Sequence, residues 1–204
     1  TTLFRSPGHP ELLDTKGVEM TTGPLGQGIA TAVGFAMAEA HLADRFNTAE
    51  QKIIDHYTYV LTGDGCLQEG VSSEASSLAG HLKLGKLIAF YDRNQITIEG
   101  STDLAFDEDV AKRYEAYGWE VIDVADGNDT VAIGQAIEKA KANKDQPSII
   151  ISHSQIGYGS PLVGSASTHG SPLGEENIIE TKKALGWDVN LEPFSIPQEL
   201  EEYM

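Results

Sequence analysis

Two short motifs in this sequence combine residue types that can hold a divalent cation against a phosphate group. Asp64 lies within the turn Gly63–Gly65, directly after the apolar run Tyr57–Thr62. Asn94 follows a second apolar run, Leu87–Tyr91. If both runs are strands of one parallel sheet, their carboxyl ends meet at the edge where open α/β sheets bind ligands. We therefore expect the carboxylate and the carboxamide to lie close together.

The chemistry of this pair suits magnesium better than most cations. One carboxylate and one amide oxygen enclose a bare cation poorly, but Mg²⁺ completes its octahedral shell with phosphate oxygens and water. Asp64 and Asn94 are therefore interpreted as half of a metal–diphosphate site. On the residues alone, a turn-forming role for Asp64 between two glycines stays open. A nucleophilic role for Cys66 is disfavoured, because no histidine lies nearby in the sequence and small buried cysteines are common.

Composition limits the classes of partner. The chain has 204 residues, of which 40% are hydrophobic and 22% charged, enough for one sizeable α/β domain. The formal charge of -17 argues against binding to nucleic acid or to an anionic membrane, and no apolar run is long enough to cross a bilayer. An acidic protein that binds a diphosphate needs a cation, or backbone N–H groups at helix starts, to offset the repulsion. A single cysteine excludes an internal disulfide and favours a reducing compartment, so we expect a cytoplasmic protein.

Hydrophobic patterning predicts strands that alternate with helices. The predicted strands are Tyr57–Thr62, Leu87–Tyr91, Trp119–Val124 and Ser148–Ser152. The predicted helices are Ile29–Arg45, Glu69–His81, Asp107–Tyr117, Asp129–Asn143 and Glu175–Leu185. This alternation predicts an α/β fold with a parallel sheet flanked by helices on both faces. Loops are expected before Thr22 and over Asp92–Thr102, and the Ala- and Gly-rich helix Ile29–Arg45 is expected to be buried.

Further segments carry a family resemblance, in one order along nearly the whole chain. They are Ser6–Glu11, Thr21–Gly28, Gly63–Gly70, Ser72–Gly85, Phe106–Trp119, Ile156–Gly159 and His169–Gly170. Together with Asn94 they resemble the transketolases, and the fold implied is the thiamine diphosphate-binding fold. The resemblance implies that residues 1–188 are the diphosphate-binding domain without its first segment. Residues 189–204 would then begin a linker to a pyrimidine-binding domain that is absent. The opening at Thr1 rather than Met favours a piece of a longer chain.

The resemblance implies roles for individual residues around the metal. Asp64 and Asn94 would ligate Mg²⁺ or Ca²⁺ through their side chains, and Ile96 through its backbone carbonyl. Gly63 and Gly65 would let the backbone approach the diphosphate, which a side chain at Gly65 would push away.

The resemblance also assigns residues to the rest of the cofactor site. Gly23 and Leu25 would approach the aminopyrimidine, and Ile156 would pack along the cofactor. His9 would hydrogen-bond the donor substrate near the reactive carbon. His169 would lie between the diphosphate and the substrate oxygen that gains negative charge.

Two carboxylates and one arginine near the motifs also bear on the resemblance. Glu69 and Glu74 would belong to a carboxylate network that reaches the partner subunit's cofactor site, although exposed helix carboxylates are the ordinary alternative. Arg93 stands where the family more often has an acidic or polar residue. Alternation along the strand should turn its side chain away from the metal.

The activity implied by the resemblance is transfer of a two-carbon ketol unit from a ketose phosphate to an aldose phosphate, in the pentose phosphate pathway. A homodimer through the cofactor face is implied as well. We expect this chain alone to be inactive, because the family's activating carboxylate and aromatic pocket come from another domain of the neighbouring subunit. Three hypotheses stay open: a segment of a transketolase, one subunit of a split transketolase, or a non-catalytic cofactor-binding fragment.

Overall fold

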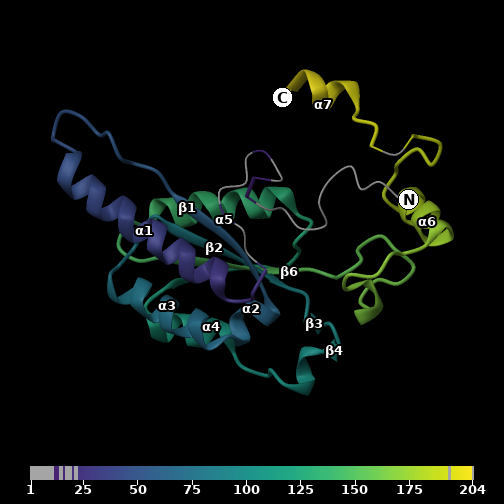
Figure 1. Ribbon diagram of the computed structural model, residues 1–204, viewed down its shortest axis with the longest axis horizontal. Coiled ribbons are helices and arrows are strands. Elements are labelled where there is room, and N and C mark those ends of the chain that lie inside the picture. The colour runs from purple at the N-terminus through teal and green to yellow at the C-terminus, as the bar shows by residue number, and fades with distance from the viewer. Residues whose placement is uncertain (1–11, 14–15, 17–19, 21–22, 193, 204) are drawn as a thin grey trace.

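The computed structural model describes residues 12–13, 16, 20, 23–192 and 194–203. Helices and strands alternate along most of this range (Figure 1). The strands are β1 (Thr58–Gly63), β2 (Leu87–Arg93), β3 (Ile96–Thr97), β4 (Gly100–Ser101), β5 (Glu120–Val124) and β6 (Ser148–His153). The helices are α1 (Gln27–Phe46), α2 (Asp64–Gln68), α3 (Gly70–His81), α4 (Val110–Tyr117), α5 (Thr130–Ala142), α6 (Glu175–Ala184) and α7 (Gln198–Tyr203). Short 3₁₀ helices are η1 (Thr102–Leu104) and η2 (Ala166–Thr168).

The main sheet is parallel throughout, with strand order β1-β2-β6-β5. Its register places Gly63, the last residue of β1, opposite Asp92 of β2. The two strand ends that precede Asp64 and Asn94 are therefore neighbours at one edge, as predicted. The predicted parallel α/β architecture is confirmed, and each predicted strand is present with ends within two residues of those expected.

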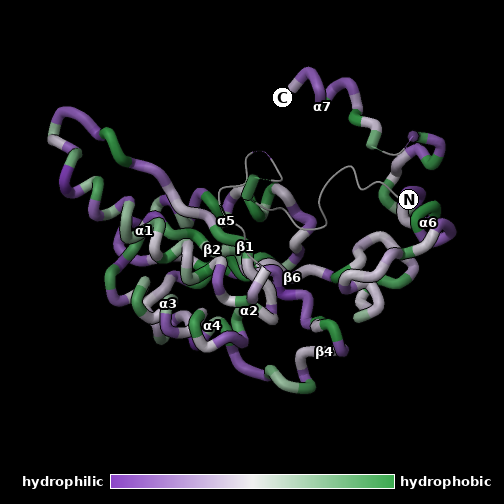
Figure 2. The backbone as a smooth tube through the Cα atoms, in the orientation of Figure 1, coloured by the Kyte–Doolittle hydropathy of each residue, from purple (hydrophilic) through white to green (hydrophobic). Residues whose placement is uncertain are grey.

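Apolar side chains project from both faces of the central strands, so helices must cover both faces of the sheet. Leu87, Ala89 and Tyr91 of β2 pack in one cluster with residues of α1, α3 and α4. Ile88 lies in a second cluster, which includes Ala136 and Ala140 of α5. Figure 2 shows the hydrophobic colour on these central strands and a mostly hydrophilic α7. This layering leaves the carboxyl edge of the sheet to loops and to the short helix α2.

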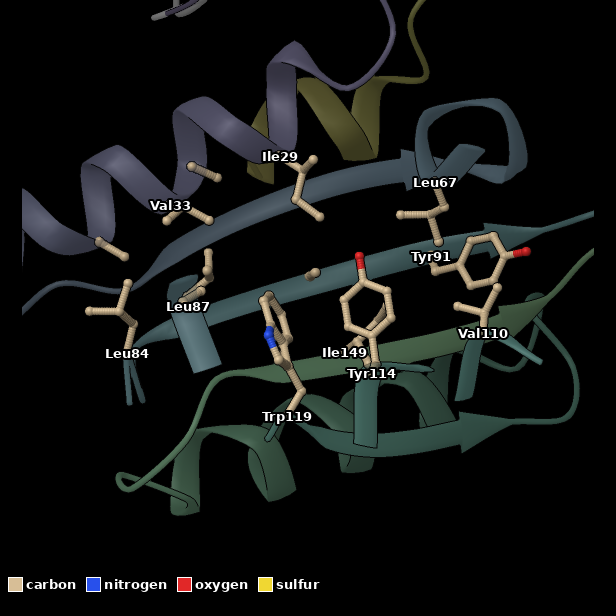
Figure 3. Close-up of a cluster of buried hydrophobic side chains, with 14 of the residues drawn as sticks. Ile29, Val33, Leu67, Leu84, Leu87, Tyr91, Val110, Tyr114, Trp119 and Ile149 are labelled. Atoms are coloured by element: carbon tan, nitrogen blue, oxygen red, sulfur yellow. The ribbon is translucent and has the colours of Figure 1, made fainter. Parts of the chain in front are cut away.

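A hydrogen-bonded aromatic pair joins α3 to α4. The Trp119 indole N–H donates to the carbonyl oxygen of Ser76 at 2.8 Å. The Tyr114 hydroxyl lies 3.0 Å from Ser76 Oγ, and the Tyr114 and Trp119 rings meet edge to face with centroids 5.1 Å apart. Figure 3 shows both rings within the larger core cluster. Because the two helices approach so closely, α3 carries Gly80 where its neighbour's backbone passes.

Several expectations need correction. Helix α1 is buried on one face only, since Ile29 and Val33 are buried while Phe35 is exposed on the other face. The predicted loop Asp92–Thr102 contains the antiparallel pair β3–β4. The segment 189–204, expected to begin a linker, contains the short helix α7. These short elements depend on local hydrogen bonds that hydrophobic periodicity does not report. Within the described ranges, no helix has the length and apolar character needed to span a bilayer.

Substituting alanine at Gly80 should destabilise the fold. A methyl group there would lie 1.8 Å from the Tyr117 carbonyl oxygen, so α4 must shift. We expect a loss of about 2–3 kcal/mol in the free energy of unfolding, measured by urea denaturation. Gly134 in α5 is the matched control, because nothing lies within 4 Å of the added methyl group. Gly134→Ala should stabilise by roughly 1 kcal/mol through helix propensity. Equal effects of the two substitutions would show that close packing at Gly80 is unimportant.

Tyr114 should make stability depend on alkaline pH. Burial raises the pKa of its hydroxyl to about 12. The unfolded chain releases this proton near pH 10, so stability is fully present below about pH 10 and falls as pH rises toward 12. The contribution of this group to the loss should reach about 2 kcal/mol near pH 12. Tyr114→Phe should therefore lose less stability than the unsubstituted protein between about pH 9 and 12 in urea denaturation. Parallel pH profiles for the two proteins would contradict this.

Candidate metal and diphosphate site

Asp64 begins α2 directly at the end of β1, where the sequence predicts only a turn. Its side chain is buried, with 5% of the residue exposed. The Tyr91 hydroxyl donates to Oδ1 at 2.5 Å, and the backbone N–H of Gln95 donates to Oδ2 at 2.9 Å. Both carboxylate oxygens are therefore fixed by donors that carry no formal charge.

The turn after β2 brings the Asn94 segment to Asp64. Gln95 adopts a left-handed conformation with φ of 61°, which turns its N–H toward the carboxylate. Asn94 Oδ1 accepts a hydrogen bond from the N–H of Ile96 at 3.0 Å, and Asn94 Nδ2 lies 3.4 Å from Asp92 Oδ2. The structure thus unites the two predicted motifs through the residue that follows Asn94.

The electrostatics at Asp64 favour a cation. No lysine, arginine or histidine among the described residues forms an ion pair with it. Burial, followed by the hydrogen bond to Asp64, raises the pKa of the Tyr91 hydroxyl well above its usual range, so this donor stays neutral. A buried carboxylate that lacks a cationic partner is costly, and a bound cation would offset that cost.

The donor set fits a cation shared with a diphosphate. Asp64 lines a cavity of about 140 Å³ together with Arg93, Thr102 and Phe106. Within the described residues, no cluster of three or more His, Cys, Asp or Glu side chains could hold a metal by itself. One carboxylate plus neutral oxygens from Asn94 and Ile96 needs further oxygens from a ligand, as Mg²⁺ commonly obtains from phosphates.

The glycine-rich segments approach each other as the site requires. A methyl group at Gly65 would lie 3.0 Å from Leu25 Cδ1, so the loop before α1 packs on the turn after β1. Leu25 is 50% exposed, which leaves an apolar surface beside Asp64's helix. At Gly63 and Gly23 nothing lies within 4 Å of an added methyl group. Open space at Gly63 is compatible with close approach by a ligand.

Other predicted residues are not joined to Asp64. His169 is exposed and follows η2, with its backbone N–H bonded to the Ala166 carbonyl at 3.0 Å. Ile156 is half-buried in the same segment after β6. Glu69, just before α3, and Glu74, within α3, are exposed. Their predicted roles, and those of His169 and Ile156, stay predictions. His9 lies outside the described residues.

Arg93 lines the same cavity as Asp64 and its guanidinium also approaches the neighbouring strands, so the predicted turn away from the metal stays a prediction. Its Nη1 lies 3.4 Å from His153 Nδ1, and His153 Nε2 lies 2.8 Å from Asp123 Oδ1. These side chains come from β2, β6 and β5, side by side at the carboxyl edge. The guanidinium is therefore engaged by the neighbouring strands and is not paired with Asp64.

Arg113 of α4 holds α2 in place, a role that the sequence does not predict. Its Nη2 donates to the Leu67 carbonyl at 2.9 Å, and its Nη1 donates to Ser73 Oγ at 3.3 Å. The same Nη1 lies 3.1 Å from Glu108 Oε2, and the guanidinium carbon lies 5.7 Å from the Phe106 ring centroid. A five-residue helix gains little from its own hydrogen bonds, so we infer that these contacts position α2.

A larger cavity lies elsewhere among the described residues. It has a volume of about 810 Å³ and lies between α1 and β1, with Phe35, Tyr59 and Leu61 in its lining. None of the predicted site residues lines it. The chemistry at Asp64, rather than the size of the cavity, therefore locates the candidate site.

A parallel α/β sheet with a buried carboxylate at its carboxyl edge places the chain in the class of open-sheet α/β domains, which bind ligands at that edge. Comparison with known proteins narrows this class. A family profile described as "Transketolase, thiamine diphosphate binding domain" matches residues 2–204. The chain belongs to the transketolase family.

Individual relatives agree with this assignment. A transketolase of a Nostoc species is 58% identical over 201 residues, covering 98% of this chain and 30% of that protein. Transketolase 1 of Saccharomyces cerevisiae is 56% identical over 200 residues, covering 98% of this chain and 29% of its own length. The structure of transketolase from Leishmania mexicana matches with a TM-score of 0.93 at 51% identity, covering 96% of this chain and 29% of that one. The chain thus spans about 30% of the length of the curated relatives it matches.

Replacing Arg113 with lysine should loosen α2. Lysine keeps the positive charge but cannot contact the Leu67 carbonyl, Ser73 and Glu108 together. We expect the free energy of unfolding to fall by about 2 kcal/mol in urea denaturation. Arg45→Lys is the control, because the guanidinium of Arg45 lies over the exposed Phe46 ring, far from α2. It should change stability by less than about 0.5 kcal/mol. A similar small change for both variants would show that Arg113 is not needed to hold α2.

Proposed function

We propose that this chain supplies the metal and diphosphate half of a transketolase site. The cofactor would be thiamine diphosphate, held through Mg²⁺ or Ca²⁺. The observation that carries the proposal is the buried Asp64 carboxylate, fixed by two neutral donors beside the Asn94 turn. Membership of the transketolase family, through its thiamine diphosphate-binding domain, supports the identity of the diphosphate.

Each residue has a distinct task in this proposal. Asp64 and Asn94 would bind the cation through side-chain oxygens, and Ile96 through its carbonyl oxygen. Gly65 would keep the start of α2 free of a side chain, and Leu25 would offer apolar surface to the cofactor's ring. When bound, thiamine diphosphate would supply the nucleophilic carbon for transfer of a two-carbon ketol unit between sugar phosphates.

Histidines would act on the substrate side of the cofactor. His9 would hydrogen-bond the donor sugar. His169 would donate to the substrate oxygen that gains negative charge, an effect typically worth about 3–4 kcal/mol when the donor is preorganised. The exposure of His169 supports this role, because its ring is accessible to a ligand.

The substrates and the oligomer belong to the same proposal. A structural match at a TM-score of 0.93 is a Pichia stipitis transketolase in complex with xylulose 5-phosphate, which supports sugar phosphates as substrates. We infer a homodimer through the cofactor face, supported by the half-exposed Leu25 beside α2. Residues 1–188 would form the diphosphate-binding domain, and residues 189–204 would begin the linker that follows it.

Two rival functions differ in their activity. A non-catalytic fragment would bind metal and cofactor without ketol transfer, and a subunit of a split transketolase would become active only with its partner polypeptide. The chain covers about 30% of the length of its relatives, so both alternative functions stay open. We expect the 204 residues alone to show no turnover of xylulose 5-phosphate with ribose 5-phosphate, whereas the intact protein should catalyse it. Turnover by the isolated chain would contradict the proposal that it holds only half of the site.

Replacing Asp64 should abolish metal-dependent cofactor binding. Asp64→Ala removes the charged ligand, and Asp64→Asn keeps the shape of the side chain while removing the charge. Calorimetric titration of thiamine diphosphate into the intact protein with Mg²⁺ should give no measurable binding for either variant. Asp103→Ala is the control, because Asp103 is an exposed carboxylate on the same cavity. Its affinity should stay within about threefold of the unsubstituted value, as expected for an exposed charge. Unchanged binding in the Asp64 variants would refute the site.

A further inference from the structure

We propose that Tyr91 is a positioning residue for the metal site, and that its hydroxyl fixes the orientation of the Asp64 carboxylate for an octahedral cation. The inference rests on the proposed function, because it assumes that Asp64 binds the metal. Tyr91 is not a ligand in this proposal. It acts through Asp64, to which its hydroxyl donates at 2.5 Å.

The placement of Tyr91 makes its hydroxyl immobile. The residue lies in β2, between β1 and β6 in the sheet, and is 1% exposed. Its ring belongs to the larger core cluster, and Figure 3 shows it at the end of the cluster where Leu67 and Val110 lie. A buried ring in a strand fixes the position of its hydroxyl oxygen, although Tyr91 also borders the cavity that Asp64 lines. From that position the hydroxyl donates to Asp64 Oδ1.

One strand and its turn hold both oxygens of the carboxylate. Tyr91 reaches Oδ1 from within β2, while the N–H of Gln95, just beyond the end of β2, reaches Oδ2 at 2.9 Å. A carboxylate oxygen has two lone-pair positions, so each oxygen can accept one hydrogen bond and still face a cation. The two donors therefore set the plane of the carboxylate and leave acceptor positions for a metal.

Neutral donors suit this task better than charged ones. A guanidinium paired with Asp64 would neutralise the charge that a metal needs. The two nearby arginines are engaged elsewhere, Arg93 with His153 and Arg113 with the Leu67 carbonyl. The hydroxyl of Tyr91 orients the carboxylate without competing for its charge. Groups that orient a metal ligand in this way typically change metal affinity by about ten- to a hundredfold when removed.

The chain offers a closely matched control in Tyr114. It lies in the same core cluster, is also 1% exposed, and has a hydroxyl 3.0 Å from Ser76 Oγ. Phenylalanine at either position removes one buried hydrogen bond and leaves the ring. A purely structural effect should therefore appear in both variants, whereas an effect on the metal should appear only at Tyr91.

The experiment measures the affinity of the intact protein for Mg²⁺ and for Ca²⁺ by calorimetry at saturating thiamine diphosphate. We expect Tyr91→Phe to raise the dissociation constant for Mg²⁺ about tenfold or more. The loss should be smaller for Ca²⁺, because Ca²⁺ tolerates irregular coordination and Mg²⁺ does not. Tyr114→Phe should leave both constants within about twofold of the unsubstituted protein, since it lies outside the site. Melting temperatures without metal should fall similarly in both variants.

Specific outcomes would overturn the inference. It fails if the Mg²⁺ constant of Tyr91→Phe stays within about twofold of the unsubstituted value, if both tyrosine variants weaken binding equally, or if Mg²⁺ and Ca²⁺ affinities fall equally. Tyr91→Leu repeats the test in a different packing background and should show the same preferential loss of Mg²⁺. Failure of the proposed function is separable, because in that case the unsubstituted protein shows no Asp64-dependent binding at all.

Discussion

The site depends on a carboxylate that is buried without a cationic partner in the described structure. Placing Asp64 at the start of α2 with 5% exposure requires donors for both of its oxygens. Tyr91 and the Gln95 backbone meet this requirement only if β1 and β2 are neighbours in the observed register. The hydrogen bonds of Asp64 therefore depend on the parallel register of β1 and β2 and on the left-handed Gln95. A divalent cation would offset the negative charge that these neutral donors leave on Asp64.

The distribution of positive charge supports the same reading. The chain carries a formal charge of -17, yet the arginines closest to the site are directed to other acceptors. Arg93 lies beside His153, which in turn pairs with Asp123. Arg113 donates to the Leu67 carbonyl near the end of α2. Both arginines stabilise the framework, and neither neutralises Asp64. A cation would offset the repulsion between such an acidic chain and a diphosphate, which agrees with the proposed metal-dependent cofactor site.

Local patterns predict the strands and the two motifs, because burial on both faces produces apolar runs and ligand-binding residues follow strand ends. The sequence does not predict helix α2, because the glycines around Asp64 indicate a turn and five residues are too few to show helical periodicity. Tyr91 is predicted only as a strand residue. Its hydroxyl, which donates to Asp64, belongs to an apolar run, although a tyrosine at the last predicted strand position, near Asn94, is a usable signal. Arg113 resembles a surface charge in the sequence, because its partners are distant along the chain. The position of His169 is set by the long segment after β6, and hydrophobic periodicity does not predict the conformation of that segment.

The position of the Asp64 carboxylate is coupled to packing contacts of α2 behind the sheet edge. Helix α2 is too short to persist by itself, and its carbonyl groups are held from outside by the Arg113 guanidinium and by Ser72 Oγ, 2.5 Å from the Cys66 carbonyl. These donors sit on α4 and α3, which are joined by the Tyr114, Trp119 and Ser76 contacts. The Arg113 and Ser72 donors thus hold α2, which begins at Asp64, against α4 and α3.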